Sequence, residues 1–197
     1  MAQERVIGIL LAGGLSSRYG EPKAFATWKN KKFYIWSYNI LHDLCDEVIV
    51  VTREDLQALF PKNIVTITDV EPFVGCGPLA GIYSAMETVE GTQYVVLPCD
   101  MPLMEKDVIK KLIEKHKKGV TVVKTEHYIQ ALVSIWDKSM KQLIYEALIQ
   151  KQYKIKAVLK EPYVHMVEGK SLTDEAHIFS NINTKEEERR LEAWNRL

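Results

Sequence analysis

One stretch near the beginning of the chain most constrains its fold, because an apolar segment leads directly into a loop that contains glycines and cations. The apolar run Val6–Leu11 has the length and composition of a buried β-strand. Gly13 and Gly14 follow it, and then Arg18 and Lys23. Glycines allow backbone N–H groups to approach an anion because no Cβ intervenes, and successive N–H groups form an anion-binding concavity. We interpret this stretch as a triphosphate-binding loop at the carboxyl end of a first strand, where open α/β sheets bind ligands.

Two common phosphate-binding motifs are absent from this loop. The dinucleotide pattern G-x-G-x-x-G does not fit, because Gly13 and Gly14 are adjacent and the next glycine is Gly20. The P-loop pattern requires G-K-[ST], whereas Gly20 is followed by Glu21. A plain turn after a strand would also use two glycines, so the glycines alone leave both interpretations open. The arginine and the lysine favour a phosphate ligand, since one can bind its oxygens as a fork and the other adds a point charge.

The remaining chain alternates apolar runs with segments of helical periodicity. This alternation predicts a three-layer α/β/α sandwich with a mostly parallel sheet, to which the late strands could add an antiparallel edge. No repeat, low-complexity tract or linker interrupts the pattern, so we expect one domain over residues 1–197. The further strands expected are residues 47–51, 64–68, 94–97, 120–124, 129–136 and 163–167, and the helices expected are residues 31–44, 54–60, 78–86, 105–117 and 138–150, with a last helix after a capping box at 184–187.

A carboxylate follows the expected strand 94–97, where Asp100 stands between Pro98 and Pro102. This strand should lie beside the first one, so we expect Asp100 at the ligand edge of the sheet, facing the glycine loop. There it could hold Mg²⁺, which binds one or two carboxylates together with phosphate oxygens and water. The alternative interpretation is an aspartate that caps a turn.

A second aspartate and a helix start indicate a base pocket. Asp69 ends the expected strand 64–68, and a carboxylate can accept hydrogen bonds from adjacent N–H and amino donors of a nucleotide base. A turn aspartate is again the alternative. Gly77-Pro78 begins a helix, with proline at the first helical position, where its missing N–H costs nothing. We expect backbone groups of Leu11–Ala12 and Pro78–Leu79 to line the pocket.

Composition and charge exclude several classes of protein. The net charge is +0, so no broad basic face for nucleic acid is implied. No apolar segment reaches the ~18 residues that span a bilayer, and the first residues lack a signal-peptide pattern. Three cysteines without a C-x-x-C pattern favour a reducing compartment over a disulfide framework or a zinc site. We therefore expect a cytoplasmic protein that binds neither nucleic acid nor a membrane.

The stretch Leu11–Lys23 resembles the signature loop of the nucleotidyltransferases, L-A-G-G-x-S-x-R-x-G-x-x-K, and is most similar to that of the bacterial molybdenum cofactor guanylyltransferases. Three later segments, residues 77–81, 98–102 and 181–184, resemble further motifs of this family in the same order. The chain departs from the family pattern in a few places. Tyr19 stands in place of a methionine, Glu21-Pro22 in place of an aspartate before the lysine, and Ala131 in place of a proline.

The resemblance implies a Rossmann-like nucleotidyltransferase fold that transfers GMP from GTP to the phosphate of molybdenum-molybdopterin, releasing pyrophosphate and molybdopterin guanine dinucleotide cofactor. It implies Mg²⁺ on Asp100, with Arg18 and Lys23 neutralising the leaving pyrophosphate, and it allows contacts with other proteins of molybdenum cofactor biosynthesis. The nucleotide-binding residues would be Leu11, Ala12, Gly13, Gly14, Lys23, Asp69, Pro78, Leu79 and Asp100.

The acceptor side is less defined by the motifs. Asn181 and Asn183 alternate with Ile182, so both face one way if the segment is extended; the family resemblance puts them at the border of the active site, and asparagines that fix a turn are the alternative. The basic segment 151–160 is by default a solvated face, although an anionic pterin phosphate could use its lysines.

Two further functions remain open. A cytidylyl- or sugar-phosphate nucleotidyltransferase would share the fold, but cytidylyltransferases more often show Ala-Ala or Ala-Gly in place of Gly13-Gly14. A non-catalytic nucleotide-binding partner in cofactor insertion would not need the metal carboxylate, so the joint presence of Arg18, Lys23 and Asp100 argues against it.

Overall fold

The computed structural model describes residues 4–14, 19–126, 128–160, 162–184, 186–187 and 189. Within them, a seven-stranded sheet has the order β5-β4-β1-β6-β8-β7-β9. None of the helices in these residues is long and apolar enough to cross a membrane. The strands are β1 (Val6–Leu11), β4 (Glu47–Val51), β5 (Thr66–Ile67), β6 (Gln93–Pro98), β7 (Val120–Lys124), β8 (Ile129–Asp137) and β9 (Val164–Glu168).

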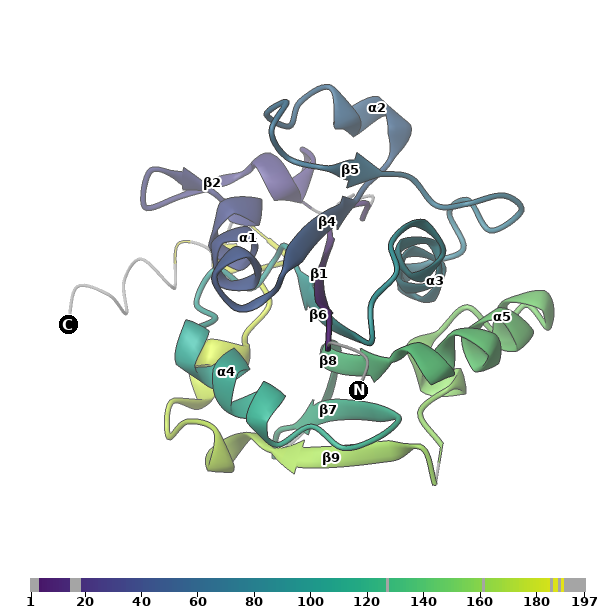
Figure 1. Ribbon diagram of the computed structural model, residues 1–197. Helices are drawn as coiled ribbons and strands as arrows, with labels where there is room; N and C mark the ends of the chain where they lie inside the picture. Colours follow the sequence, from purple (N-terminus) through teal and green to yellow (C-terminus); the bar gives the residue numbers. More distant parts are fainter. Residues whose placement is uncertain are drawn as a thin grey trace.

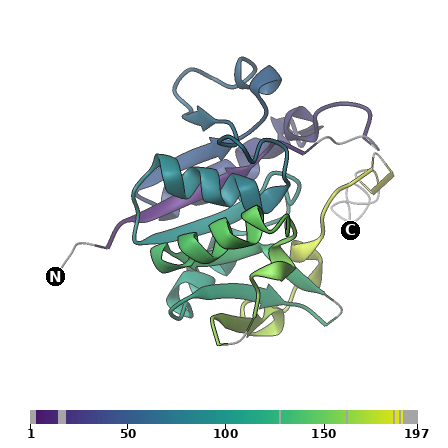
Figure 2. The ribbon, with the colours of Figure 1, turned by 90° about the vertical axis from the view of Figure 1, so that its right-hand side faces the viewer.

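Helices cover both faces of the sheet. On one face lie α1 (Phe33–Leu44) and α4 (Lys106–Glu114), and on the other lie α3 (Pro78–Thr88) and α5 (Lys141–Ile149) (Figure 1). Figure 2 shows α3 and α5 in front of the strands. Each face buries its own apolar cluster, because the inner strands alternate side chains between the two helical layers. The predicted three-layer α/β/α sandwich is therefore confirmed.

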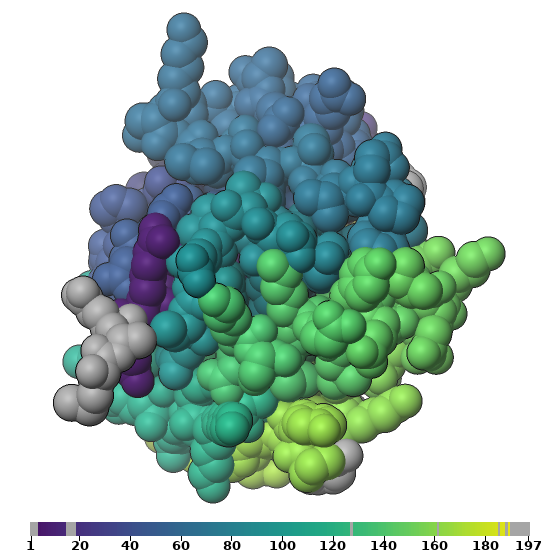
Figure 3. All heavy atoms as spheres, turned by 45° about the vertical axis from the view of Figure 1, so that its right-hand side comes forward, coloured from purple at the N-terminus to yellow at the C-terminus, as the bar shows by residue number. Residues whose placement is uncertain are grey.

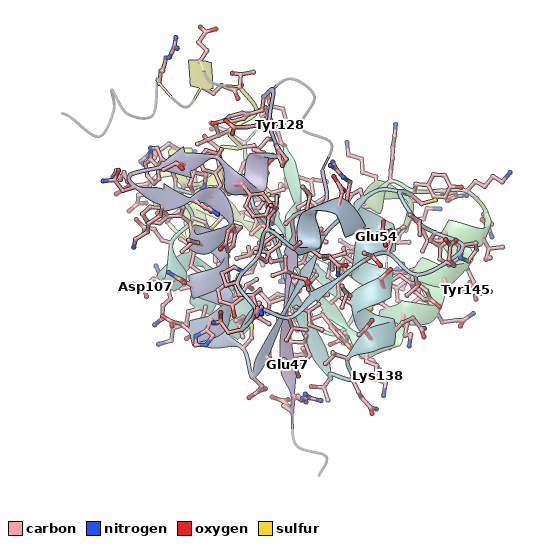
Figure 4. The ribbon with its side chains drawn as sticks, turned by 90° about the horizontal axis from the view of Figure 1, so that it is seen from above. Glu47, Glu54, Asp107, Tyr128, Lys138 and Tyr145 are labelled. Atoms are coloured by element: carbon pink, nitrogen blue, oxygen red, sulfur yellow. The ribbon has the colours of Figure 1, made fainter. Side chains whose placement is uncertain are left out.

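The strands at the centre of the sheet bring three loops to one edge. β1 pairs in parallel with β4 and with β6, so that Leu11 lies opposite both Val51 and Pro98. In Figure 4, Glu47 at the start of β4 and Lys138 after β8 lie at one end of the sheet, and Tyr128 before β8 lies at the other. The expected adjacency of the strand before Asp100 and the first strand is confirmed.

The antiparallel strand is inside the sheet and not at its edge. β8 runs antiparallel to both β6 and β7, whereas β9 pairs in parallel with β7. A short polar connection joins β7 to β8, which forces an antiparallel pair, and the apolar half of β8 is buried on both sides, including Trp136 at 0% exposure. The expectation of an antiparallel edge was wrong because periodicity identifies strands but not their neighbours.

Several local elements differ from the sequence-based expectation. A small hairpin, β2 (Thr27–Trp28) with β3 (Lys31–Lys32), precedes α1, which therefore begins two residues later than expected. α2 (Glu54–Gln57) and β5 are shorter than predicted. The capping box is present, because the Glu187 N–H donates to Thr184 Oγ1 at 3.2 Å and the Thr184 N–H donates to the Glu187 carboxylate at 3.1 Å. Short 3₁₀ turns occur at Lys23–Phe25, Lys138–Met140, Ile155–Ala157, Gly169–Ser171 and Ala176–Phe179.

Candidate active site

Three side chains that are far apart in the sequence meet at the carboxyl edge of the parallel strands. The ammonium of Lys23 lies 3.0 Å from Asp100 Oδ2 and donates a hydrogen bond of 2.8 Å to Asn183 Oδ1. The Lys23 and Asp100 side chains are only 12% and 17% exposed. The structure thus brings together the predicted cation, the predicted metal carboxylate and one of the two predicted asparagines. Asn181 is exposed, and no described residue forms a hydrogen bond with its side chain.

The late segment that carries Asn183 is fixed to the site by its neighbour Ile182. The Ile182 N–H donates to the Asp100 carbonyl oxygen at 2.9 Å. Its side chain is 1% exposed and packs in a small apolar cluster with Tyr19, Trp28 and Phe33, which come from the start of the chain. Burial of this one side chain therefore sets the position of Asn183. In the sequence, Ile182 was interpreted only as a spacer between the asparagines; the signal that could have identified its role is a single apolar residue between two polar ones.

The two oxygens of the Asp100 carboxylate differ, because one forms an ion pair and the other has no hydrogen-bond partner among the described residues. Oδ2 receives the Lys23 ammonium, whereas Oδ1 is buried and has no hydrogen-bond partner among the described residues. Burying an oxygen without a hydrogen-bond partner costs folding free energy. Such a carboxylate oxygen is a suitable ligand for a hard divalent cation. The described residues contain no group of three or more His, Cys, Asp or Glu side chains that could hold a metal by themselves. A cation here would thus need oxygens from a substrate or from water.

The adjacent Cys99 is not a nucleophile candidate. Its thiol is buried, and burial together with the Asp100 charge raises the pKa of Cys99 to about 12. The thiol stays protonated at neutral pH, whereas nucleophilic cysteines need a lowered pKa. This agrees with the interpretation of Cys99 as a small buried residue.

Asp69 lies at the junction of β5, β1 and α3. Its Oδ2 accepts the Gly75 N–H at 3.0 Å, so the carboxylate does organise its own loop, as the turn interpretation proposed. Its Oδ1 faces α3, because a Cβ built on Gly81 would lie 3.6 Å from this oxygen and 3.0 Å from Leu11 Cδ2. Burial raises the pKa of Asp69, and the Gly75 hydrogen bond partly offsets that effect. One carboxylate oxygen thus faces the place where the base pocket was expected.

The predicted base-pocket segments surround the same place. The Ala12 N–H donates to the Val51 carbonyl at 2.8 Å, which holds the beginning of the glycine loop against β4. A Cβ on Gly14 would meet no atom of the described residues within 4 Å, whereas a Cβ on Gly13 would lie 3.6 Å from the Thr52 backbone. Pro78 begins α3 directly after Gly77, and Leu79 is fully buried. Arg18 lies outside the described residues, so its predicted role stays a prediction.

A comparison with known protein families identifies the family of this chain. A family model for the MobA-like NTP transferase domain matches residues 8–167 of the chain. The chain belongs to the MobA-like NTP transferase family. The matched segment of this family member begins in β1 and ends in β9, and it contains Lys23, Asp69 and Asp100. The family resemblance stated from the motifs is confirmed.

Individual relatives of this MobA-like chain cover nearly its whole length. A protein of Bacillus licheniformis named "probable molybdenum cofactor guanylyltransferase" is 35% identical over 192 residues, which cover 95% of this chain and 97% of that protein. A protein of Bacillus subtilis with the same name is 33% identical over 185 residues, or 92% of each chain. The crystal structure of molybdopterin-guanine dinucleotide biosynthesis protein A from Archaeoglobus fulgidus has the same fold, with a TM-score of 0.81 and 24% identity over 97% of this chain and all of that one (100%).

Proposed function

We propose that this protein transfers GMP from GTP to the phosphate of molybdenum-molybdopterin, forming the guanine dinucleotide cofactor and pyrophosphate. The similarity to relatives named molybdenum cofactor guanylyltransferase supports the reaction. The observation that carries it to particular residues is the cluster of Lys23, Asp100 and Asn183 beside the glycine loop. A protein that only bound nucleotide would have no use for a buried carboxylate oxygen at this edge.

The reaction brings two anionic phosphates together, so its main obstacle is charge repulsion. Nucleotidyl transfer depends mainly on positioning and electrostatic stabilisation, and it needs no covalent nucleophile on the protein. Lys23 is placed to neutralise phosphate charge, and its contact with Asn183 limits where the ammonium can move. Backbone N–H groups of the glycine loop would hold the triphosphate.

The residues fit a divalent cation at Asp100, because Oδ1 is buried without a partner among the described residues and Oδ2 lies at the same edge as the glycine loop. We propose that Asp100 holds Mg²⁺ together with phosphate oxygens and water. When bound, the ion would supply positive charge between the two reacting phosphates. Lys23 would then be released from its ion pair with Asp100 to contact the leaving pyrophosphate.

We assign the choice of guanine to Asp69. Its Oδ2 is engaged by its own loop, and its Oδ1 lies on the side of α3 and Leu11. A carboxylate in this position would accept hydrogen bonds from the guanine N1–H and amino groups, which cytosine cannot offer as an adjacent pair. The free state of Cys45, Cys76 and Cys99 is consistent with a reaction in the reducing cytoplasm.

Pyrophosphate release tests the proposal. The protein is incubated with molybdenum-molybdopterin, Mg²⁺ and one of the four nucleoside triphosphates, and pyrophosphate is measured with and without a chelator of divalent cations. We expect release with GTP that stops when the metal is removed. Preference for CTP would contradict the assignment of the base, and tight GTP binding without any pyrophosphate would favour the non-catalytic alternative.

A further inference from the structure

A surface cavity of about 490 Å³ opens beside the first turn of α3. Three segments line it: residues 75–78 before and at the start of α3, Ala131 and Leu132 in β8, and residues 153–156 after α5. Figure 3 shows the green surface of α5 and its following segment next to the teal surface of α3. The two helices are joined there by aromatic contacts, with ring centroids of Tyr83 and Tyr145 5.7 Å apart. The cavity thus lies beside two helices that pack against each other.

The wall from β8 exists because this strand is bulged. β8 pairs with β7 through Ser134 opposite Val122, and the pairing resumes only at Gln130 opposite Val123, so residues 131–133 have no partner on β7. Ala131 and Leu132 are half-buried and belong to the cavity lining. Bulges beside functional sites redirect side chains in this way. The strand is held on the other side of the bulge, where the Gln130 amide donates to the Phe179 carbonyl at 3.1 Å.

The lining combines apolar and aromatic surface with two cations. Pro78, Leu132 and Tyr153 offer flat or apolar contacts, and the Tyr153 hydroxyl lies near the Cys76 thiol. Lys154 and Lys156 are exposed at the cavity, and within the part of the chain that the structure describes neither of them forms an ion pair. Such a surface suits a ligand with a flat ring body and anionic groups.

The strand order places this cavity on the acceptor side of the site. The glycine loop follows β1, Asp100 follows the neighbouring β6, and the bulge lies in β8, which is the next strand along. Pro78 belongs both to the cavity and to the segment proposed for the base. A ligand in the cavity would therefore lie close to a nucleotide without occupying the glycine loop.

We propose that this cavity binds the ring system of the acceptor, with the pterin against Leu132, Pro78 and Tyr153 and the anionic molybdenum–dithiolene group near Lys154 and Lys156. This inference rests on the proposed function, because it names the place where the second substrate of that reaction binds. The phosphate arm of the acceptor would extend toward Asp100. The bulge in β8 is then a substrate-binding feature.

Separate binding measurements for the two substrates test the inference. Leu132→Trp fills the cavity, and the double variant Lys154→Ala/Lys156→Ala removes its charge. Lys110→Ala/Lys118→Ala is the matched control, because both of these lysines are exposed on the opposite side of the molecule, in and after α4. The Kd of molybdenum-molybdopterin is measured anaerobically from its fluorescence or absorbance change, and the Kd of a non-hydrolysable GTP analogue is measured by calorimetry.

We expect the Kd of the acceptor to rise about tenfold or more in both cavity variants, and the Kd of the GTP analogue to change less than about twofold. The control should match the wild-type protein in both measurements, and circular dichroism checks that each variant is folded. An unchanged Kd for the acceptor overturns the inference while the proposed function stands. Weakened GTP binding with unchanged acceptor binding would assign the cavity to the base. If the wild-type protein binds neither substrate, the proposed function itself fails.

Discussion

The pair of Lys23 and Asp100 allows stability and function to be separated by a double-mutant cycle. The three variants are Lys23→Met, Asp100→Asn and the combination, which all keep the approximate size of the side chains. In each single variant one polar partner remains at the carboxyl edge without its counter-charge. In the double variant neither charge remains, so the two effects on stability should compensate in part.

The magnitude follows from the geometry of the pair. At a separation of 3.0 Å, two unit charges attract by about 5.5 kcal/mol at an effective dielectric constant of 20. Desolvation of the two side chains, which are 12% and 17% exposed, opposes this attraction. Removing one partner of a buried pair costs about 3–5 kcal/mol, and an exposed pair contributes under about 1 kcal/mol. For this partly accessible pair, we expect each single variant to lose about 2 kcal/mol of unfolding free energy and the double variant to lose less than the sum.

Turnover should respond differently from stability. Because each group is proposed to act on phosphate charge in the transition state, loss of either one should lower kcat by about a hundredfold or more. The double variant should be at least as inactive as the single variants. Urea unfolding measures the free energy of unfolding, and pyrophosphate release with GTP and the acceptor measures kcat. Recovery of activity together with stability in the double variant would refute the reasoning, because it would show that the pair is only structural.

Three further outcomes are expected. Ile182→Ala removes a buried side chain and should cost about 2–5 kcal/mol of packing free energy. The segment that carries Asn183 should then detach from the site and kcat/KM should fall about tenfold, whereas Ile182→Val should have a small effect. Equal activity of both variants would contradict the anchoring role. Alkylation at pH 8 followed by peptide mass spectrometry should modify Cys76 and spare Cys45 and Cys99, because burial raises the pKa of each of these two thiols to about 12; rapid labelling of Cys99 would oppose this. Burial also raises the pKa of Asp69, so ionisation of this carboxyl destabilises the fold above the ordinary aspartate pKa of about 4. In urea unfolding, Asp69→Asn should therefore be more stable than the wild-type protein at pH 7 but not at pH 3.5, and it should bind GTP more weakly. A lower stability of this variant at pH 7 would show that the carboxylate mainly fixes its loop.

The parts of the site that the sequence predicted are those that follow from strand ends. Val6–Leu11 and the strand before Asp100 are continuous apolar runs, and two such buried strands place their following loops at one edge when they lie side by side in parallel. This is why the meeting of Lys23 and Asp100 could be expected. The contact of Lys23 with Asn183 spans 160 residues, and only the resemblance to a family motif suggested it.

The parts that were missed depend on tertiary contacts. The hairpin of β2 and β3 turns at Lys29 and Asn30, which have φ values of +46° and +60°, and the turn has no glycine to indicate it. β8 lies between β6 and β7 because it pairs with one of these strands along each edge. The hydrophobic periodicity of the sequence does not predict which strands become neighbours. The single-domain expectation for residues 1–197 and the role of Arg18 stay predictions.

The hydrogen bond between Ile182 and Asp100 has a consequence for how the protein matures during synthesis. The strands and helices up to β9 can pack before Ile182 and Asn183 are synthesised, because the central sheet does not include this segment. Asn183 reaches Lys23 only after the segment that carries Ile182 has been translated. A nascent chain that stops before Ile182 would therefore contain the central sheet and lack the contact between Lys23 and Asn183, so in the proposed reaction it should be less active than the longer chain.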